Sequence, residues 1–190
     1  MHLFFDTETT GLPRNWKAPV QHVENWPRAV QLAWLVFDNQ GMQRSARSYV
    51  IKPNGFTIPI EASRIHRITH EHASMYGVPL RPVLEEFGAL VKAADLVVAH
   101  NISFDEKIIG AEFLRHGLEN PIEAAKRVCT MERSTAFCKL PGPYGFKWPK
   151  LSELHQTLFG EPLVDAHDAS VDIKATAKCF WEMRRRGIIQ

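Results

Sequence analysis

The sequence has few cysteines, no long apolar run and little excess charge of either sign, and each shortage excludes a class of protein. Its three cysteines, Cys129, Cys138 and Cys179, are widely spaced, which argues against a disulfide framework and a thiolate zinc site. No segment approaches the roughly 20 apolar residues of a membrane span. A secretory leader is not expected either, because acids arrive early, at Asp6 and Glu8. These shortages predict a soluble, cytoplasmic protein with no membrane partner.

The overall composition is that of an ordinary globular domain. The chain has 190 residues, of which 45% are hydrophobic and 23% are charged, and its formal net charge is +2. This length fits one domain, residues 1–190, with a sizeable core. The slight basic excess permits contact with nucleic acid without arguing for it, so any such surface must be local.

Two carboxylates one residue apart follow the first apolar run of the chain. Residues i and i+2 of a strand point to the same side, so Asp6 and Glu8 are expected to project together. A divalent cation would relieve their repulsion, and ligation by oxygen alone favours Mg²⁺ or Mn²⁺ over Zn²⁺. The alternative is an acidic strand end that faces water, and the pair alone does not decide between the two.

The hydrophobic pattern predicts an α/β fold that begins with an antiparallel hairpin. One helix is expected to end near residue 116, with Ser103 and Glu106 at capping-box spacing. The last helix is expected over residues 166–186, with Asp165 as its N-cap. The strands are predicted at residues 2–5, 29–37, 44–51, 96–99 and 127–130. The other helices are predicted at residues 81–93, 131–138 and 151–159, with short helical turns between 59 and 77.

Two long loops mix aromatic and basic side chains. In the first, residues 11–27, Trp16 and Trp26 could stack on nucleobases or simply pin the loop to the core. The second, residues 139–150, could form a wall that binds a nucleic-acid strand, or could be a plain connector. Its aromatic residues are Tyr144, Phe146 and Trp148, and its basic residues are Lys139, Lys147 and Lys150.

Four carboxylates and one histidine, supplied by three separate segments, form the candidate catalytic site. Asp105 is expected in the first turn of a helix at the carboxyl edge of the sheet, where open α/β sheets bind ligands. His167 and Asp172 lie near the start of the last helix. Each has a plain explanation alone, as a first-turn acid, a surface acid or a capping histidine. Together with Asp6 and Glu8 they indicate a dinuclear metal site with an adjacent base.

Such a site suits phosphodiester hydrolysis, for which two ions lie about 3.5–4 Å apart. Asp6 is expected to bridge both ions, Glu8 and Asp172 to complete one, and Asp105 to reach the other through water. An imidazole pKa of about 6.5 suits His167 to accept the proton of the attacking water. The neighbouring Asp168 is explained as a first-turn acid and is not expected to be a ligand.

Three segments carry a resemblance to a known family. Residues 5–11 (FDTETTG), 100–105 (HNISFD) and 167–172 (HDASVD) look like the three motifs of the DnaQ-like, DEDDh 3'-to-5' exonucleases, in the same order. The resemblance implies a ribonuclease H-like fold, an α/β arrangement with a five-stranded mixed sheet flanked by helices. It also implies two Mg²⁺ or Mn²⁺ ions and the release of nucleoside 5'-monophosphates from a free 3' end.

The same resemblance assigns a set of substrate-binding residues. Those after the first strand would hold the terminal nucleotide, and those near Asp105 would shape the site. Two more belong to a segment after the hairpin, in which Arg67 stands where the family commonly has glycine. The 11–27 loop is longer than in compact members, which leaves the geometry near the 3' end open. The set comprises Thr9, Gly11, Leu12, His66, Ile68, Asn101 and Phe104.

The leading expectation is a metal-dependent exonuclease that acts on single-stranded or frayed DNA ends, in proofreading or repair, with a polymerase or repair complex as a candidate partner. An exoribonuclease that trims RNA ends fits the same residues, because the distinction depends on contacts to the 2'-hydroxyl. An endonuclease would need an open groove instead of a pocket for a terminal nucleotide. An inactive nucleic-acid-binding module would be expected to lack some of the acids or the base, and all are present. The oligomeric state is not readable from the sequence.

Overall fold

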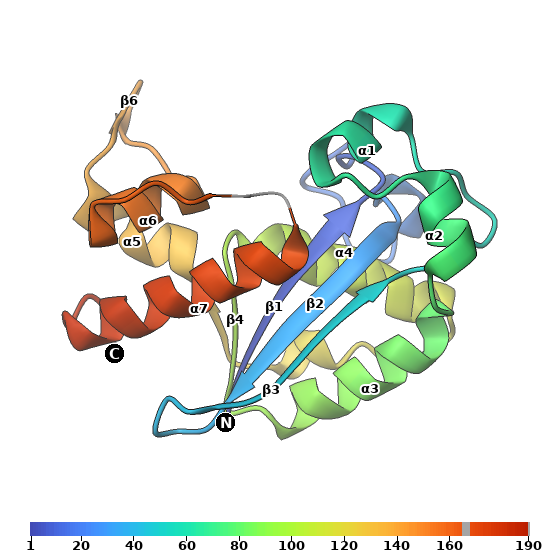
Figure 1. The fold of residues 1–190 in the computed structure, drawn as a ribbon, viewed down its shortest axis with the longest axis horizontal. Coiled ribbons are helices and arrows are strands. Elements are labelled where there is room, and N and C mark those ends of the chain that lie inside the picture. Colours follow the sequence, from blue (N-terminus) through green and yellow to red (C-terminus); the bar gives the residue numbers. More distant parts are fainter. Residues whose placement is uncertain (165–167, 190) are drawn as a thin grey trace.

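The computed structural model describes residues 1–164 and 168–189 and shows a mixed sheet with helices on both faces (Figure 1). The sheet has five strands in the order β3-β2-β1-β4-β5. Strand β2 runs antiparallel to β1 and β3, whereas β4 runs parallel to β1 and β5. The five strands are β1 (His2–Thr9), β2 (Ala29–Phe37), β3 (Gln43–Val50), β4 (Leu96–Ala99) and β5 (Arg127–Cys129). The predicted five-stranded α/β fold is confirmed.

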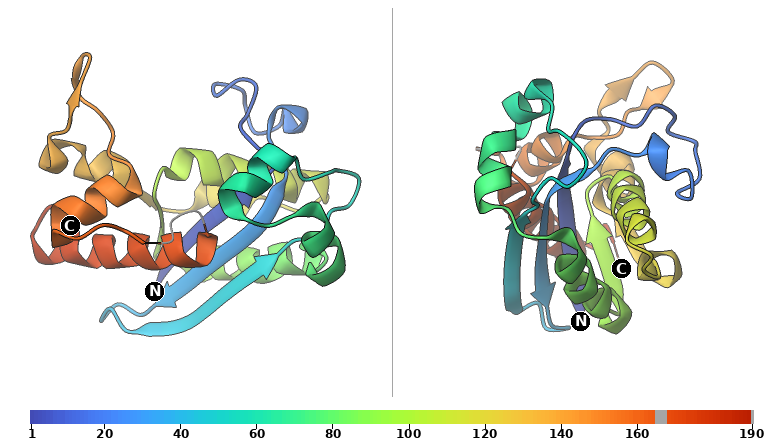
Figure 2. Two further views of the ribbon diagram at one scale, coloured as in Figure 1. Left: turned by 45° about the horizontal axis from the view of Figure 1, so that its top comes forward. Right: turned by 90° about the vertical axis from the view of Figure 1, so that its right-hand side faces the viewer.

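Helices cover the two faces of this sheet as separate groups (Figure 2). Helix α7 (Ala169–Arg185) lies across one face together with α5 (Thr130–Cys138) and α6 (Leu151–Phe159). Helices α3 (Leu80–Ala93) and α4 (Ile102–Arg115) cover the other face. None of the described helices is long and apolar enough to cross a membrane. The shorter elements are α1 (Ile60–His66), α2 (His70–Tyr76) and the 3₁₀ helices η1 (Val23–Asn25) and η2 (Pro121–Ala124).

Strand β1 connects the two halves of the core because its side chains alternate between the faces. Phe4 packs edge-on against Phe180 of α7, with ring centroids 5.1 Å apart. Phe5 points the other way and packs on Phe87 of α3 at 5.2 Å. All four rings are fully or almost fully buried. The packing of the apolar half of β1 therefore determines toward which face of the sheet each later side chain of the strand points.

Helix α4 begins differently from the sequence-based expectation. The predicted capping box of Ser103 and Glu106 is wrong, because the helix already starts at Ile102. Asn101 is the N-cap and has a left-handed backbone conformation, with φ 66°, which asparagine tolerates better than most residues. This conformation turns the chain directly from β4 into the helix, so Ser103 lies inside the first turn.

Helix α7 starts later than predicted. Its first residue is Ala169 rather than residue 166, and Asp168 is its N-cap. The Asp168 carboxylate accepts hydrogen bonds from the backbone N–H of Ser170 at 2.7 Å and from its hydroxyl at 2.6 Å. The predicted cap, Asp165, lies outside the described residues. A carboxylate at the N-cap satisfies donors that the helix itself leaves unpaired.

A buried glutamate holds the first long loop against helix α4. Glu112 has no exposed surface, and its Oε1 accepts a hydrogen bond from Nε of Arg28 at 2.8 Å. The same oxygen lies 3.1 Å from Nη1 of Arg115. Arg115 in turn donates to the backbone oxygens of Val23 and Trp26 in the loop. The loop is therefore fixed by charge-assisted hydrogen bonds at its C-terminal end.

The two tryptophans of this loop have different environments. Trp26 is buried, and its indole N–H donates to the backbone oxygen of Pro19 at 3.1 Å. Trp16 is 51% exposed, and its ring lies 5.6 Å from the ring of Phe104 at the start of α4. Packing against the core thus explains Trp26, whereas Trp16 presents an open face beside a predicted site residue.

The second long loop forms a small hairpin instead of an irregular connector. Strands β6 (Pro141–Gly142) and β7 (Gly145–Phe146) pair antiparallel, and α6 begins shortly after them. The hairpin stands away from the sheet, next to α5 and α6 (Figure 1).

Replacing Glu112 with alanine should destabilise the fold by about 3–5 kcal/mol, because it leaves Arg28 and Arg115 without their buried counter-charge. Urea unfolding followed by circular dichroism would measure the change. Glu119→Ala is the control, since it removes an exposed pair with Lys92 and should have a much smaller effect. Equal effects of the two variants would show that the buried network does not hold the fold.

Candidate active site

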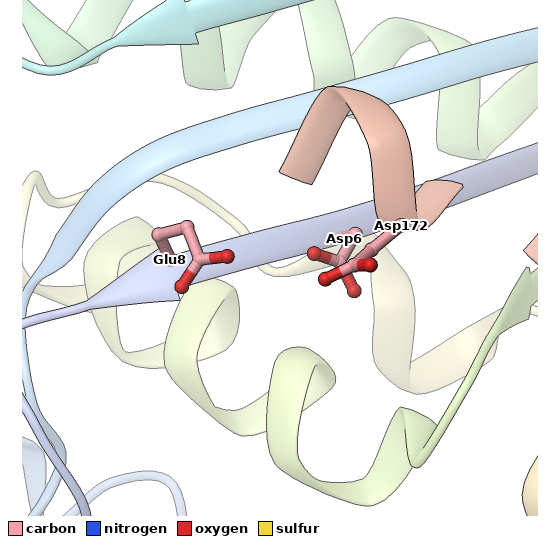
Figure 3. Close-up of side chains that lie close together, drawn as sticks. All are labelled: Asp6, Glu8 and Asp172. Carbon is pink, nitrogen blue, oxygen red and sulfur yellow. The ribbon is translucent and has the colours of Figure 1, made fainter. Parts of the chain in front are cut away.

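Three carboxylates meet where strand β1 passes the first turn of helix α7 (Figure 3). Asp6 and Glu8 lie on the side of β1 that Phe4 presents to α7, because strand side chains alternate. Asp172 approaches them from α7. One oxygen of each carboxylate lies within 4.8 Å of the others, and all three residues are partly buried. The acidic pair predicted on the first strand thus acquires its third member from the far end of the chain.

Crowding and burial make these groups difficult to ionise. The pKa of Asp6 is raised well above its usual range, first by burial and then by the charges of Asp105 and Asp172. Burial, followed by the charge of Asp172, raises the pKa of Glu8 to about 8. A cation held between the carboxylates would favour their ionised forms. Three carboxylate oxygens at this spacing fit a hard divalent ion such as Mg²⁺ or Mn²⁺.

Asp105 stands beside this cluster and not in it. It lies in the first turn of α4, is 3% exposed, and its Oδ1 accepts from the Thr7 hydroxyl at 2.6 Å and from the Thr7 N–H at 3.1 Å. Burial raises the pKa of Asp105 to about 7 even though both Thr7 hydrogen bonds lower it. Its charge also contributes to the raised pKa of Asp6 and of Glu8. Thr7, which orients this fourth acid, was not among the predicted site residues.

The predicted base, His167, lies outside the described residues. Its neighbour Asp168 also accepts a hydrogen bond of 3.4 Å from the Gln31 side chain on β2. Burial alone would raise the pKa of Asp168, but the hydrogen bonds from Ser170 and Gln31 lower it on balance. These hydrogen bonds support the interpretation of Asp168 as a helix cap. It fixes the first turn of α7, and with it the position of Asp172.

A constrained turn follows the carboxylates at the end of β1. The Thr9 hydroxyl donates to the backbone oxygen of Gly11 at 2.7 Å. Gly11 has φ 146°, a conformation that residues with a Cβ rarely adopt, so glycine is needed here. The next residue, Leu12, is 72% exposed. An exposed apolar side chain on a fixed turn is suited to contact a planar base.

The other predicted substrate residues lie on two further elements. Asn101 and Phe104 begin α4, directly before Asp105. His66 and Ile68 are both buried, and the backbone N–H of Ile68 donates to Nδ1 of His66 at 3.1 Å. Burial lowers the pKa of His66, which favours the neutral ring. Asn101 and Phe104 thus lie beside Asp105, whereas His66 and Ile68 are buried, and contacts of all four with a substrate stay predictions.

Arg67, between His66 and Ile68, stands where the family commonly has glycine, and its backbone conformation accounts for this difference. Arg67 is the C-cap of α1 and has a left-handed conformation, with φ 64°. Glycine is the residue that most easily adopts this conformation at a helix end. The backbone turn is thus kept although the residue differs.

In a buffer with chelator, Glu8→Gln should stabilise the protein at high pH. The ordinary pKa of this carboxyl is 4.5 and its folded value is about 8, so the wild type loses stability as the pH rises between these values. The variant should melt several degrees above the wild type near pH 9 and about equally near pH 5. Differential scanning fluorimetry would measure both curves.

Mg²⁺ or Mn²⁺ should then raise the melting temperature of the wild type far more than that of Glu8→Gln. Glu119→Gln, which changes an exposed carboxylate, should follow the wild type in both experiments. Parallel pH curves for Glu8→Gln and the wild type would contradict the crowding of these acids.

Comparisons with known proteins identify the fold and the family of the chain. No curated protein sequence matches the chain. Among solved structures, E. coli exonuclease I in complex with a dA16 oligonucleotide superposes with a TM-score of 0.76 and 20% identity over 97% of this chain and 41% of that chain. Exonuclease I from Methylocaldum szegediense gives a TM-score of 0.74 and 22% identity over 97% of this chain and 40% of that chain.

The chain spans about two fifths of the length of these exonucleases, and the likeness establishes the shared fold. A family model, RNase_T, described as Exonuclease, matches residues 3–180. The match runs from β1 to α7 and includes all the described carboxylates of the site. The chain therefore belongs to this exonuclease family, the DnaQ-like 3'-to-5' exonucleases with a ribonuclease H-like fold.

Proposed function

We propose that the protein is a metal-dependent 3'-to-5' exonuclease that releases nucleoside 5'-monophosphates from single-stranded or frayed DNA ends. The observation that carries this proposal is the meeting of Asp6, Glu8 and Asp172, with oxygens within 4.8 Å of one another between the central strand β1 and α7. The solved structures of E. coli exonuclease I with dA16 and dT13 oligonucleotides favour DNA as the substrate.

The carboxylates would hold two divalent cations. Asp6 would contribute to both positions, Glu8 and Asp172 to one, and Asp105 to the other through water. Bound there, the ions would activate water for attack on the phosphodiester and stabilise negative charge as the bond breaks. A zinc-bound form of the E. coli exonuclease I–ssDNA complex is known, but oxygen ligands alone favour Mg²⁺ or Mn²⁺ in this chain.

The other residues of the site would bind the strand end and move a proton. The Thr9–Gly11 turn and Leu12 would hold the terminal nucleotide, since the turn directly follows Glu8 in the chain and carries an exposed apolar side chain. His167 would accept the proton of the attacking water on an imidazole nitrogen, for which its ordinary pKa of about 6.5 is suited. Asp105, fixed by Thr7, would keep its orientation during the reaction.

A time course on 5'-labelled single-stranded DNA and RNA of one sequence tests the proposal. With Mg²⁺ or Mn²⁺, the products should form a ladder that shortens from the 3' end, faster on DNA, and chelator should stop it. Asp6→Asn should abolish cleavage while leaving the protein folded, and Glu119→Gln should cleave normally. Normal cleavage by Asp6→Asn would exclude Asp6 from the site, and faster cleavage of RNA would change the proposed substrate.

His167→Ala should lower the rate by about 10²–10⁴-fold, as is typical when general base catalysis is lost. Its rate should also lose the rise with pH around the imidazole pKa, because the bound cations keep the carboxylates ionised and the proton acceptor itself has been removed. Steady-state rates between about pH 5 and 9 would measure this. His72→Ala, which changes an exposed histidine of α2, is the matched control. A pH profile identical to that of the wild type would count against His167 as the base.

A further inference from the structure

The β6–β7 hairpin carries a group of aromatic side chains that the rest of the described chain does not cover. Tyr144 is fully exposed, at 102%, whereas Phe146 is 55% and Trp148 63% exposed. Aromatic rings bury large apolar areas when they pack, and a cluster of exposed rings marks a surface that contacts something else.

The hairpin is nevertheless firmly attached at its base. Pro149, which precedes Lys150, the N-cap of α6, has its backbone oxygen 3.0 Å from Nε2 of His100. The other ring nitrogen of His100 lies 3.0 Å from the hydroxyl of Thr130, which begins α5. Glu153 of α6 accepts from Lys147 at 2.5 Å and from the Lys150 N–H at 2.8 Å. The exposed rings are thus held in place by contacts that do not involve them.

The attachment point places the hairpin on the same edge of the sheet as the candidate active site. His100 directly precedes Asn101, the N-cap of α4, and Asp105 follows in the first turn of that helix. In Figure 1 the hairpin rises beyond α5 and α6, to the left of the carboxyl end of β1, which lies below α1. The base of the hairpin is therefore tied to the segment that leads to Asp105, while its rings stand apart from the carboxylate cluster.

The charge of the hairpin segment indicates what the rings contact. Residues 139–150 contain three lysines and no acid, and Lys139 and Lys150 are exposed. Lysine is depleted at protein–protein interfaces, whereas aromatic rings interleaved with cations are typical of surfaces that bind single-stranded nucleic acid. Bases stack on the rings, and phosphates lie near the ammonium groups.

We propose that the β6–β7 hairpin is a second nucleic-acid-binding site, at which Tyr144 and Phe146 stack on bases of a single strand whose 3' end occupies the carboxylate site. This inference rests on the proposed function and adds to it a contact upstream of the cleaved bond. The hairpin would contact only nucleotides upstream of the 3' end. The affinity for a strand should therefore rise once the strand is long enough to reach the hairpin.

Binding of 5'-fluorescein-labelled dT20 and dT4, measured by fluorescence anisotropy in chelator, tests the proposal without cleavage. Tyr144→Ala/Phe146→Ala should weaken binding of dT20 by about 30-fold or more, the loss of two stacking contacts, and leave dT4 almost unchanged. Tyr144→Trp should bind dT20 at least as tightly as the wild type. Met42→Ala is the matched control, because Met42 is 61% exposed at the opposite end of the sheet.

Hydrolysis of the p-nitrophenyl ester of thymidine 5'-monophosphate separates this inference from the proposed function. The double variant should hydrolyse this small ester like the wild type, since the hairpin touches only the longer strand. If the wild type hydrolyses neither the ester nor an oligonucleotide, the proposed function is overturned. Unchanged dT20 affinity in the double variant would overturn the hairpin site and assign its rings to a protein partner. An equal loss for dT4 and dT20 would also overturn it.

Discussion

Repulsion between carboxylates is the constraint on which the described site depends. Packing of Phe4 against Phe180 orients β1 and α7 so that Asp6, Glu8 and Asp172 must lie close together. The apolar core therefore supplies the free energy that holds like charges near one another. A cation between these carboxylates would offset their repulsion, which links the stability of the site to its proposed chemistry.

Elements with a strong local signal were predicted well. Strands β2 and β4 and helix α6 have the predicted bounds, because continuous apolar runs and a glycine stop are local properties of the sequence. The starts of α4 and α7 were not predicted well. They depend on a left-handed Asn101 and on the Asp168 cap, for which neighbouring residues offered equally good candidates.

Three of the predicted carboxylates, Asp6, Glu8 and Asp172, do lie together, but the contacts around them were not predicted. The spacing of Asp6 and Glu8 predicted their shared face, but the hydrogen bonds from Thr7 to Asp105 join residues almost a hundred positions apart. No local pattern reports such a contact. Glu112 did leave a signal, since it is an acid at a position where α4 is otherwise apolar. An acid on the buried face of a helix requires a partner, and a search for that partner would have led to Arg28, directly after the 11–27 loop.

The order of β1 and α7 along the chain has a consequence during synthesis on the ribosome. Strand β1 lies in the middle of the sheet, yet its acidic residues are completed by α7, which follows all the other described elements in the sequence. A nascent chain that has not yet released α7 has no assembled cation site. The proposed nuclease activity would thereby be absent until translation has passed residue Asp172, and fragments that end before it would lack this activity.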